Sequence, residues 1–340
     1  MSVAVTRHLS DRGVVTADVN VDVTNSCRLG RPLSIVATVF LPPPERLSAG
    51  QPVLFALPGG GYSRGYFDMH FPGHVGYSQA AHHVAQGLAV VSFDPLGAGG
   101  STPDVSAVVR IEDIAAANDL AVRMISDRLS RGDLVPGYPP VDIGNRIGIG
   151  QSMGGGVTIV MAGVHHTYDA IAVLGWSAIH TVVPQRRRED SEYTATQLTH
   201  DLSEAPETLS VQQASEKIPD FLYPFFWEDV PADIVAADTQ GGYPIRDVAP
   251  AFGSKTLQNC VVAMLSPGYV SREAEAVSVP VFIGLGERDT APEPHREPRA
   301  YVNSSNISLF VCERMAHMHN FASTREKLWD RLAQWSTSLS

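Results

Sequence analysis

Residues 147–157, IGIGQSMGGGV, place one serine hydroxyl among glycines. An apolar run typical of a strand precedes Ser152 and a helical pattern follows it, so Gly150, Ser152 and Gly154 form a G-x-S-x-G sequence at a strand-to-helix turn. Such a turn exposes the serine hydroxyl, and glycine avoids a clash where strand and helix cross. A phosphate-binding P-loop is excluded because no lysine follows the glycines. The pattern predicts a nucleophilic Ser152, with a glycine-rich turn of purely structural role as the alternative.

A serine nucleophile needs a base to take its proton, and the base needs a carboxylate to orient it. With the serine in this kind of turn, the acid comes next in chain order and the histidine last. Asp289 follows the apolar run 279–286 and is the expected acid. Glu287 is the rival carboxylate, but it lies nearer the strand and is expected to point away. A solvated loop acid is the alternative reading of Asp289.

Two histidines near the end of the chain, His317 and His319, compete for the role of general base. We expect the base to be His317, because the small Ala316 before it permits a tight turn. The final helix is then expected to begin near Asn320, a good N-cap residue. His319 stays open as the alternative base, since the sequence does not decide which imidazole faces Ser152.

Three successive glycines, Gly59, Gly60 and Gly61, follow the apolar run 52–57. Without Cβ atoms, their backbone amides can approach a negatively charged oxygen closely. We expect one donor to such an oxyanion from Gly60 or Gly61, and a second from the amide of Met153. A plain loop is the alternative.

The elements that must position these residues alternate between strand and helix patterns. Residues 14–23 and 33–42 show period-2 alternation and predict an amino-terminal antiparallel hairpin. Short apolar runs then occupy residues 52–57, 88–93, 146–150, 170–175, 279–286 and 307–312, and helical patterns occupy residues 76–87, 111–129 and 321–335. This order predicts an α/β fold with a mostly parallel, doubly wound sheet. Ligands in such folds bind at the carboxyl ends of the strands, where the candidate residues lie.

Composition limits the partners of the chain. Its 340 residues can bury one large core, and a net charge of −11 argues against binding to nucleic acid or to an anionic membrane surface. Cys27, Cys260 and Cys312 lack metal-binding spacing and are expected to be reduced thiols. With neither a secretory leader nor a membrane span in the sequence, we expect a cytoplasmic protein. Its oligomeric state, a homodimer included, is left open.

Several of these motifs together resemble serine hydrolases of the α/β-hydrolase fold superfamily, of the esterase kind. The resemblance covers residues 35–176 and 277–336 and includes GQSMGG, PGGGY, FDPLGAGGS, GERD and the late histidine. One departure is Pro58, which stands where the oxyanion loop of esterases usually has a histidine. The resemblance implies hydrolysis of a small, mostly apolar carboxylic ester through an acyl-enzyme, without metal or organic cofactor. A carbon–carbon bond hydrolase, an acyltransferase and a non-catalytic ligand-binding receptor are the alternatives.

Residues 177–275 interrupt the alternation and are too long for a simple crossover. In this superfamily such a segment resembles a cap, here a mainly helical insertion between core segments 1–176 and 276–340. Its aromatic residues could exclude water from an apolar pocket. The residues expected to line the substrate pocket are Tyr62, Phe225, Phe226 and Trp227. The alternative is that the aromatic cluster forms a small core of the cap itself.

Overall fold

The structure, a computed structural model, describes residues 6–9, 14–204 and 210–339. Within these residues nine strands form one sheet in the order β1-β2-β3-β5-β4-β6-β7-β8-β9. The strands are β1 (Thr6–Leu9), β2 (Val15–Asp22), β3 (Ser34–Leu41), β4 (Gln51–Leu57), β5 (Ala89–Phe93), β6 (Ile143–Gln151), β7 (Ala170–Leu174), β8 (Val281–Arg288) and β9 (Ile307–Ala316).

The direction of the strands confirms the predicted fold class. β2 and β3 pair antiparallel, from Val15 opposite Leu41 to Asp22 opposite Ser34, as the hairpin prediction required. β3 also runs antiparallel to β5, and from β5 to β9 all neighbouring strands are parallel. The carboxyl ends of β6 and β8 therefore lie at the same edge of the sheet, which brings together the segments that follow them.

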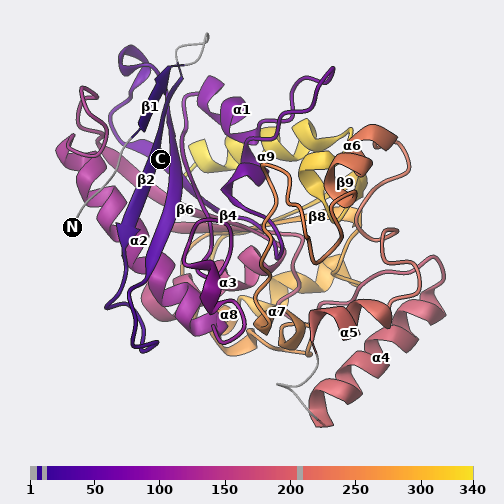
Figure 1. The fold of residues 1–340 in the computed structure, drawn as a ribbon. Helices are drawn as coiled ribbons and strands as arrows, with labels where there is room; N and C mark the ends of the chain where they lie inside the picture. Colours follow the sequence, from indigo (N-terminus) through magenta and orange to yellow (C-terminus); the bar gives the residue numbers. More distant parts are fainter. Residues whose placement is uncertain (1–5, 10–13, 205–209, 340) are drawn as a thin grey trace.

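Helices cover both faces of the sheet (Figure 1). α1 (Gln79–Ala85) and α9 (Arg325–Thr337) lie on one face, and α2 (Ile111–Arg131) and α3 (Met153–His165) lie on the other. Successive side chains of a strand point to opposite faces, and β4 follows this rule. Phe55 packs in the core on the side of α2 and α3, whereas Leu54 packs in the core on the side of α1 and α9.

The start of the final helix differs from the prediction. α9 begins at Arg325, and Asn320 lies instead in a short 3-10 turn, His319–Phe321. Its side chain is buried, where the amide nitrogen donates to the carbonyl of Tyr66 at 3.1 Å and the amide oxygen accepts from the Trp329 indole at 2.9 Å. The prediction that Asn320 caps the helix was wrong because tertiary partners use its side chain.

The long segment between β7 and β8 contains, in its described part, α4 (Arg188–Glu204), α5 (Val211–Glu216), α6 (Ala232–Thr239), α7 (Cys260–Ala263) and α8 (Ser271–Ala276). α4 and α5 project at the lower right of Figure 1, far from the antiparallel end of the sheet. α8 packs closely on α3, since a Cβ at Gly163 would lie 2.2 Å from the carbonyl oxygen of Glu273. The division into a core and a separate cap stays a prediction.

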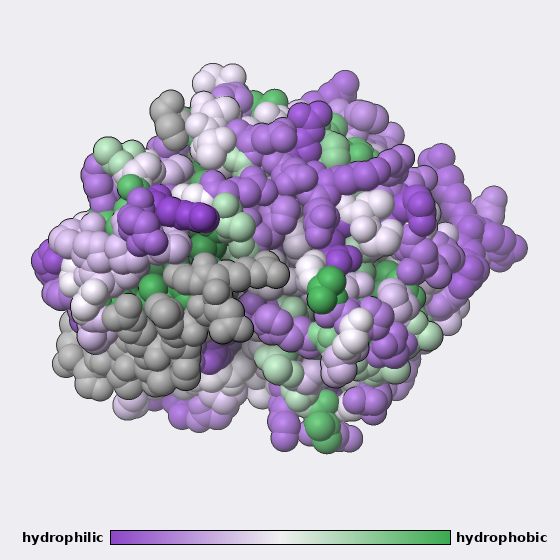
Figure 2. All heavy atoms as spheres, turned by 90° about the horizontal axis from the view of Figure 1, so that it is seen from above, coloured by the Kyte–Doolittle hydropathy of each residue, from purple (hydrophilic) through white to green (hydrophobic). Residues whose placement is uncertain are grey.

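The face of the molecule seen in Figure 2 is largely hydrophilic, with hydrophobic residues scattered or in small groups. Large exposed apolar side chains such as Val75, Val108 and Val248 come from different parts of the chain. All three cysteines are free thiols. No helix among the described residues is long and apolar enough to cross a membrane.

Candidate active site

Ser152 lies at the sharp turn between β6 and α3. Its backbone has φ 53° and ψ −126°, a conformation that costs a non-glycine residue about 1–3 kcal/mol and is held by the surrounding structure. The Ser152 amide donates to the carbonyl of Leu174 at 2.8 Å. A Cβ at Gly150 would lie 2.1 Å from the carbonyl oxygen of Gly154, and a Cβ at Gly154 would lie 2.3 Å from that of Leu57. Both glycines are therefore required by close packing.

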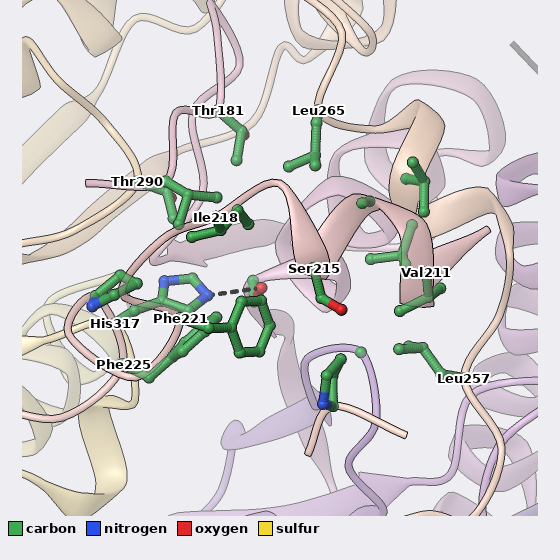
Figure 3. A pocket seen from close by; sticks show the side chains of 18 of the residues that line it. Thr181, Val211, Ser215, Ile218, Phe221, Phe225, Leu257, Leu265, Thr290 and His317 are labelled. Atoms are coloured by element: carbon green, nitrogen blue, oxygen red, sulfur yellow. Dashed lines mark hydrogen bonds between the residues drawn. The ribbon is translucent and has the colours of Figure 1, made fainter. Parts of the chain in front are cut away.

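The three side chains expected to form a triad lie in one hydrogen-bonded row. Nε2 of His317 is 2.8 Å from Oγ of Ser152, the contact drawn as a dashed line in Figure 3. Nδ1 of His317 is 2.7 Å from Oδ1 of Asp289. The serine follows β6, the aspartate follows β8 and the histidine follows β9, so three parallel strands position the row.

Asp289 is buried and accepts four hydrogen bonds. The amide of Thr290 and Nδ1 of His317 contact Oδ1, while the amide of Gly286 and Nε2 of His319 contact Oδ2. Burial raises the pKa of Asp289, but the charge of His319 and the hydrogen bonds from both histidines outweigh burial and hold the pKa well below its usual range. The carboxylate is therefore ionised at neutral pH.

An ionised carboxylate can only accept hydrogen bonds, and this fixes the proton on His317. Nδ1 must carry the hydrogen that it shares with Asp289, which leaves Nε2 as the acceptor for the Ser152 hydroxyl. The arrangement can thus move a proton from Oγ of Ser152 to Nε2 while the carboxylate stabilises the resulting imidazolium.

The structure separates the rival candidates of the sequence analysis. His319 contacts the second oxygen of Asp289 at 2.6 Å and makes no hydrogen bond to Ser152. Glu287 is exposed, and its carboxylate accepts from the amide of Arg314 at 2.8 Å. Of the two candidate bases and the two candidate acids, only His317 and Asp289 form the hydrogen-bonded row with Ser152.

The two backbone amides expected as oxyanion donors, those of Met153 and Gly60, belong to segments next to Ser152, and their role as donors stays a prediction. Met153 is the first residue of α3, so its amide is among those with no acceptor inside the helix. Gly60 lines the cavity in front of Ser152, and its missing Cβ would lie 2.8 Å from Leu257 and 3.8 Å from Sδ of Met153. The loop therefore lies against the nucleophile turn, and a side chain at position 60 would require Leu257 to shift.

Gly61, the other expected donor, differs from Gly60. It does not line the cavity, and its φ of 78° requires the glycine. Its carbonyl oxygen accepts hydrogen bonds from the guanidinium of Arg246 and the amide of Ser254. Gly61 therefore shapes the loop, and of the two glycines only Gly60 lines the cavity.

Ser152 and His317 open onto a cavity of about 130 Å³. Its polar lining residues are Ser152, Thr181, Ser215, Tyr243, Thr290 and His317, together with Trp176, whose buried indole Nε1 has no hydrogen-bond partner among the described residues. No Asp, Glu, Lys or Arg is among the described residues that line it. Apolar side chains form the rest, among them Val211, Ile218, Phe221, Phe225, Leu257 and Leu265. In Figure 3, Phe221 and Phe225 lie beside the Ser152–His317 pair.

Of the residues expected to line the pocket, the structure places only Phe225 in this cavity. Tyr62 is fully buried behind the glycine loop, where its hydroxyl donates to Asp238. Phe226 packs on Phe321, with ring centroids 5.4 Å apart, and belongs to the core beneath α9. Trp227 lines a different, larger cavity together with Arg288, whose guanidinium carbon lies 4.7 Å from a Trp227 ring centroid. The prediction that these three side chains line the cavity at Ser152 was wrong, because Tyr62 and Phe226 pack in the core and Trp227 lines the other cavity.

Sequence reasoning missed the aliphatic wall of the cavity. α5 and the turn after it contribute Val211, Ala214 and Ile218, which recur at positions i, i+3 and i+7. This spacing is the signal that could have identified them as one apolar face. It also missed Gln151, whose side-chain amide donates to the carbonyl of His317 at 2.9 Å and ties the two loops together. Nothing in the sequence indicates that contact.

Comparison with known proteins identifies the fold. Neither a family model nor a curated protein sequence matches the chain. Among solved structures, a bromoperoxidase from Bacillus anthracis matches with a TM-score of 0.60 at 14% identity, covering 94% of this chain and 99% of that one. A thermophilic esterase from Thermogutta terrifontis matches with a TM-score of 0.57 at 14% identity, covering 94% and 98%. The peroxisomal α/β-hydrolase Lpx1 from Saccharomyces cerevisiae matches with a TM-score of 0.56 at 13% identity, covering 97% and 89%. The chain therefore has the α/β-hydrolase fold.

Proposed function

We propose that this protein is a serine hydrolase that cleaves a small, mostly apolar carboxylic ester through an acyl-enzyme intermediate. The observation that carries the proposal is the hydrogen-bonded row from Ser152 through His317 to Asp289, which ends at an apolar cavity. The fold shared with an esterase is a supporting observation.

In the proposed reaction, Nε2 of His317 takes the proton from Oγ of Ser152 as that oxygen attacks the ester carbonyl. The amides of Gly60 and Met153 donate to the carbonyl oxygen as it becomes negative. His317 then returns the proton to the departing alcohol. A water molecule repeats the sequence on the acyl-enzyme, and Ser152 and the free acid are regenerated.

The cavity limits the class of ester. An apolar cavity of about 150 Å³ holds one benzene-sized molecule. At about 130 Å³, this cavity accommodates an uncharged group of similar size. A charged group would lose its hydration there without an opposite charge to compensate. We therefore expect the preferred ester to carry one apolar group of about six carbons.

A panel of p-nitrophenyl esters from acetate to dodecanoate, with fluorophosphonate labelling, tests this function. We expect an initial burst of p-nitrophenol and labelling at Ser152, with kcat/KM highest near an acyl length of six carbons. Ser152→Ala is the matched control and should show neither. Absence of both hydrolysis and labelling in the wild-type protein would refute the proposal and favour a ligand-binding receptor. Faster release of p-nitrophenol on adding a short alcohol, with a new ester as product, would instead identify an acyltransferase.

A further inference from the structure

A buried ion pair in the insertion lies directly behind the glycine loop. Arg246 and Asp238 have fully buried side chains, and Nη2 of Arg246 is 2.6 Å from Oδ1 of Asp238. The hydroxyl of Tyr62 donates to Oδ2 of Asp238, also at 2.6 Å. Replacing a buried pair by apolar residues is often neutral or stabilising, so stability alone is a weak reason for such a pair.

Arg246 also holds the loop that carries the expected oxyanion donor. Its Nη1 donates to the carbonyl oxygen of Gly61, which additionally accepts from the amide of Ser254 at 2.9 Å. The amide of Tyr62 donates to the carbonyl of Gly59 at 3.2 Å, which closes a turn with Gly60 and Gly61 at its centre. Two donors from the insertion therefore fix the last peptide group of this turn, which joins Gly61 to Tyr62.

The same guanidinium supports one wall of the cavity. Its central carbon lies 4.8 Å from the ring centroid of Tyr62 and 5.1 Å from that of Tyr243. Tyr243 lines the cavity together with Gly60. One buried cation thus contacts both the glycine turn and a residue of the cavity wall, while Asp238 holds the guanidinium in place.

We propose that Arg246 is a positioning residue for the oxyanion site: by fixing the Gly61 carbonyl, it keeps the Gly60 amide directed at the oxygen that becomes negative during the reaction. Asp238 orients Arg246 and compensates its charge. The inference rests on the proposed function. Arg246 does not line the cavity, so its effect on the reaction is indirect, and we assign that effect to the turn. Its loss should weaken binding of the transition state more than binding of the ester.

The decisive variant removes both charges at once. Arg246→Met/Asp238→Asn leaves no uncompensated buried charge and keeps an acceptor for the hydroxyl of Tyr62. We expect kcat on the best p-nitrophenyl ester to fall about 10²-fold, the loss typical of a displaced oxyanion donor, while KM changes less than about threefold. Affinity for a trifluoromethyl ketone analogue of the same ester should fall in proportion to kcat/KM, since this probe forms an oxyanion on Ser152.

Arg325 offers a matched control, because its guanidinium is also largely buried and donates to backbone carbonyls, those of Gly76 and Ala322. Arg325→Met should lower thermal stability while kcat stays within about threefold of wild type. Arg246→Lys is the second test variant in case the double variant does not fold. Lysine keeps the charge facing Asp238 but lacks the planar fork that reaches both Asp238 and Gly61, so its kcat should still fall at least about tenfold.

Three results would overturn the inference. A folded double variant or Arg246→Lys variant with wild-type kcat would show that the turn does not depend on this guanidinium. A raised KM with unchanged kcat would show that Arg246 only shapes the cavity wall. An equal loss of kcat in Arg325→Met would show a general effect of removing a buried arginine. A wild-type protein without ester hydrolysis is distinguishable from all three and would refute the proposed function together with this inference.

Discussion

His317 and His319 share the carboxylate of Asp289, yet replacing each by alanine should have very different effects. His317→Ala removes the only imidazole hydrogen-bonded to Ser152, so the nucleophile loses its base. We expect kcat to fall about 10³-fold or more, which corresponds to about 4 kcal/mol of lost transition-state stabilisation. The loss should equal that of Ser152→Ala, because members of a triad act as a unit.

His319→Ala leaves the other three hydrogen bonds to Asp289 in place, those from His317, Thr290 and Gly286. The carboxylate therefore stays oriented, and kcat should fall about tenfold or less, equivalent to at most about 1.4 kcal/mol. The free energy of unfolding should change more clearly than kcat. The variant loses a buried hydrogen bond to a charged group, which is worth about 1.5–3 kcal/mol, and gains a cavity.

The assay measures kcat with one activated ester and unfolding in urea for both variants. The exposed His70, changed to alanine, is the control for a histidine far from the site. The expected pattern is a catalytic loss for His317→Ala and a loss mainly of stability for His319→Ala. A large loss of kcat in His319→Ala together with near wild-type kcat in His317→Ala would refute the reasoning and transfer the role of base to His319.

Three further predictions concern the same site. Ser152→Ala should abolish hydrolysis and fluorophosphonate labelling while thermal unfolding stays cooperative; near wild-type turnover would exclude the acyl-enzyme. Phe225→Ala should raise KM for hexanoate more than for acetate esters, whereas Trp227→Ala, outside the cavity, should alter both equally; the reverse would place Trp227 against substrate. Asp289→Asn should lower the free energy of unfolding at pH 7. The pKa of Asp289 is lower in the folded state than the ordinary value of 3.8, so its charged form stabilises the native state above that value. This stabilisation disappears as the pH falls towards and through the folded-state pKa. Urea midpoints should therefore differ most above about pH 5 and converge in acid; a constant difference would contradict the assigned pKa shift.

β4, β5, β7 and β8 could be located from the sequence because their central residues are buried on both faces, but the ends of other strands could not. β9 extends to Ala316, past the apolar run that ends at residue 312, and its added residues Glu313 and Arg314 are exposed. β6 begins at Ile143, before the expected start at residue 146, in a portion that is only partly buried. Apolar patterning marks where a strand is buried, whereas hydrogen bonding decides where it ends.

The candidate site shows a similar division. Chain order and the glycine turn were enough to select Ser152, Asp289 and the loop that holds both histidines. The sequence favoured His317 but left His319 open as the base, since both imidazoles reach the same carboxylate from positions two residues apart. The cavity wall could not be predicted either. Its residues come partly from α5 and α7, which only folding brings together. The aromatic run at residues 221–227 was the more conspicuous signal in the sequence.

Two backbone hydrogen bonds couple the insertion to the loop that carries His317. The amide of His317 donates to the carbonyl of Pro224, and the amide of Met318 donates to that of Phe225, both at 3.0 Å. Separating these segments costs at least about 2 kcal/mol if each bond contributes about 1 kcal/mol, and it also breaks the contact of Phe225 with His317. A conformer with both bonds broken therefore has a population of at most a few per cent. In that conformer the imidazole loses the backbone anchor that sets its distance to Ser152. A ligand that fills the cavity and holds Phe225 in place therefore also favours the conformer in which His317 is hydrogen-bonded to Ser152. Ligand binding and the correct placement of the base are thermodynamically linked.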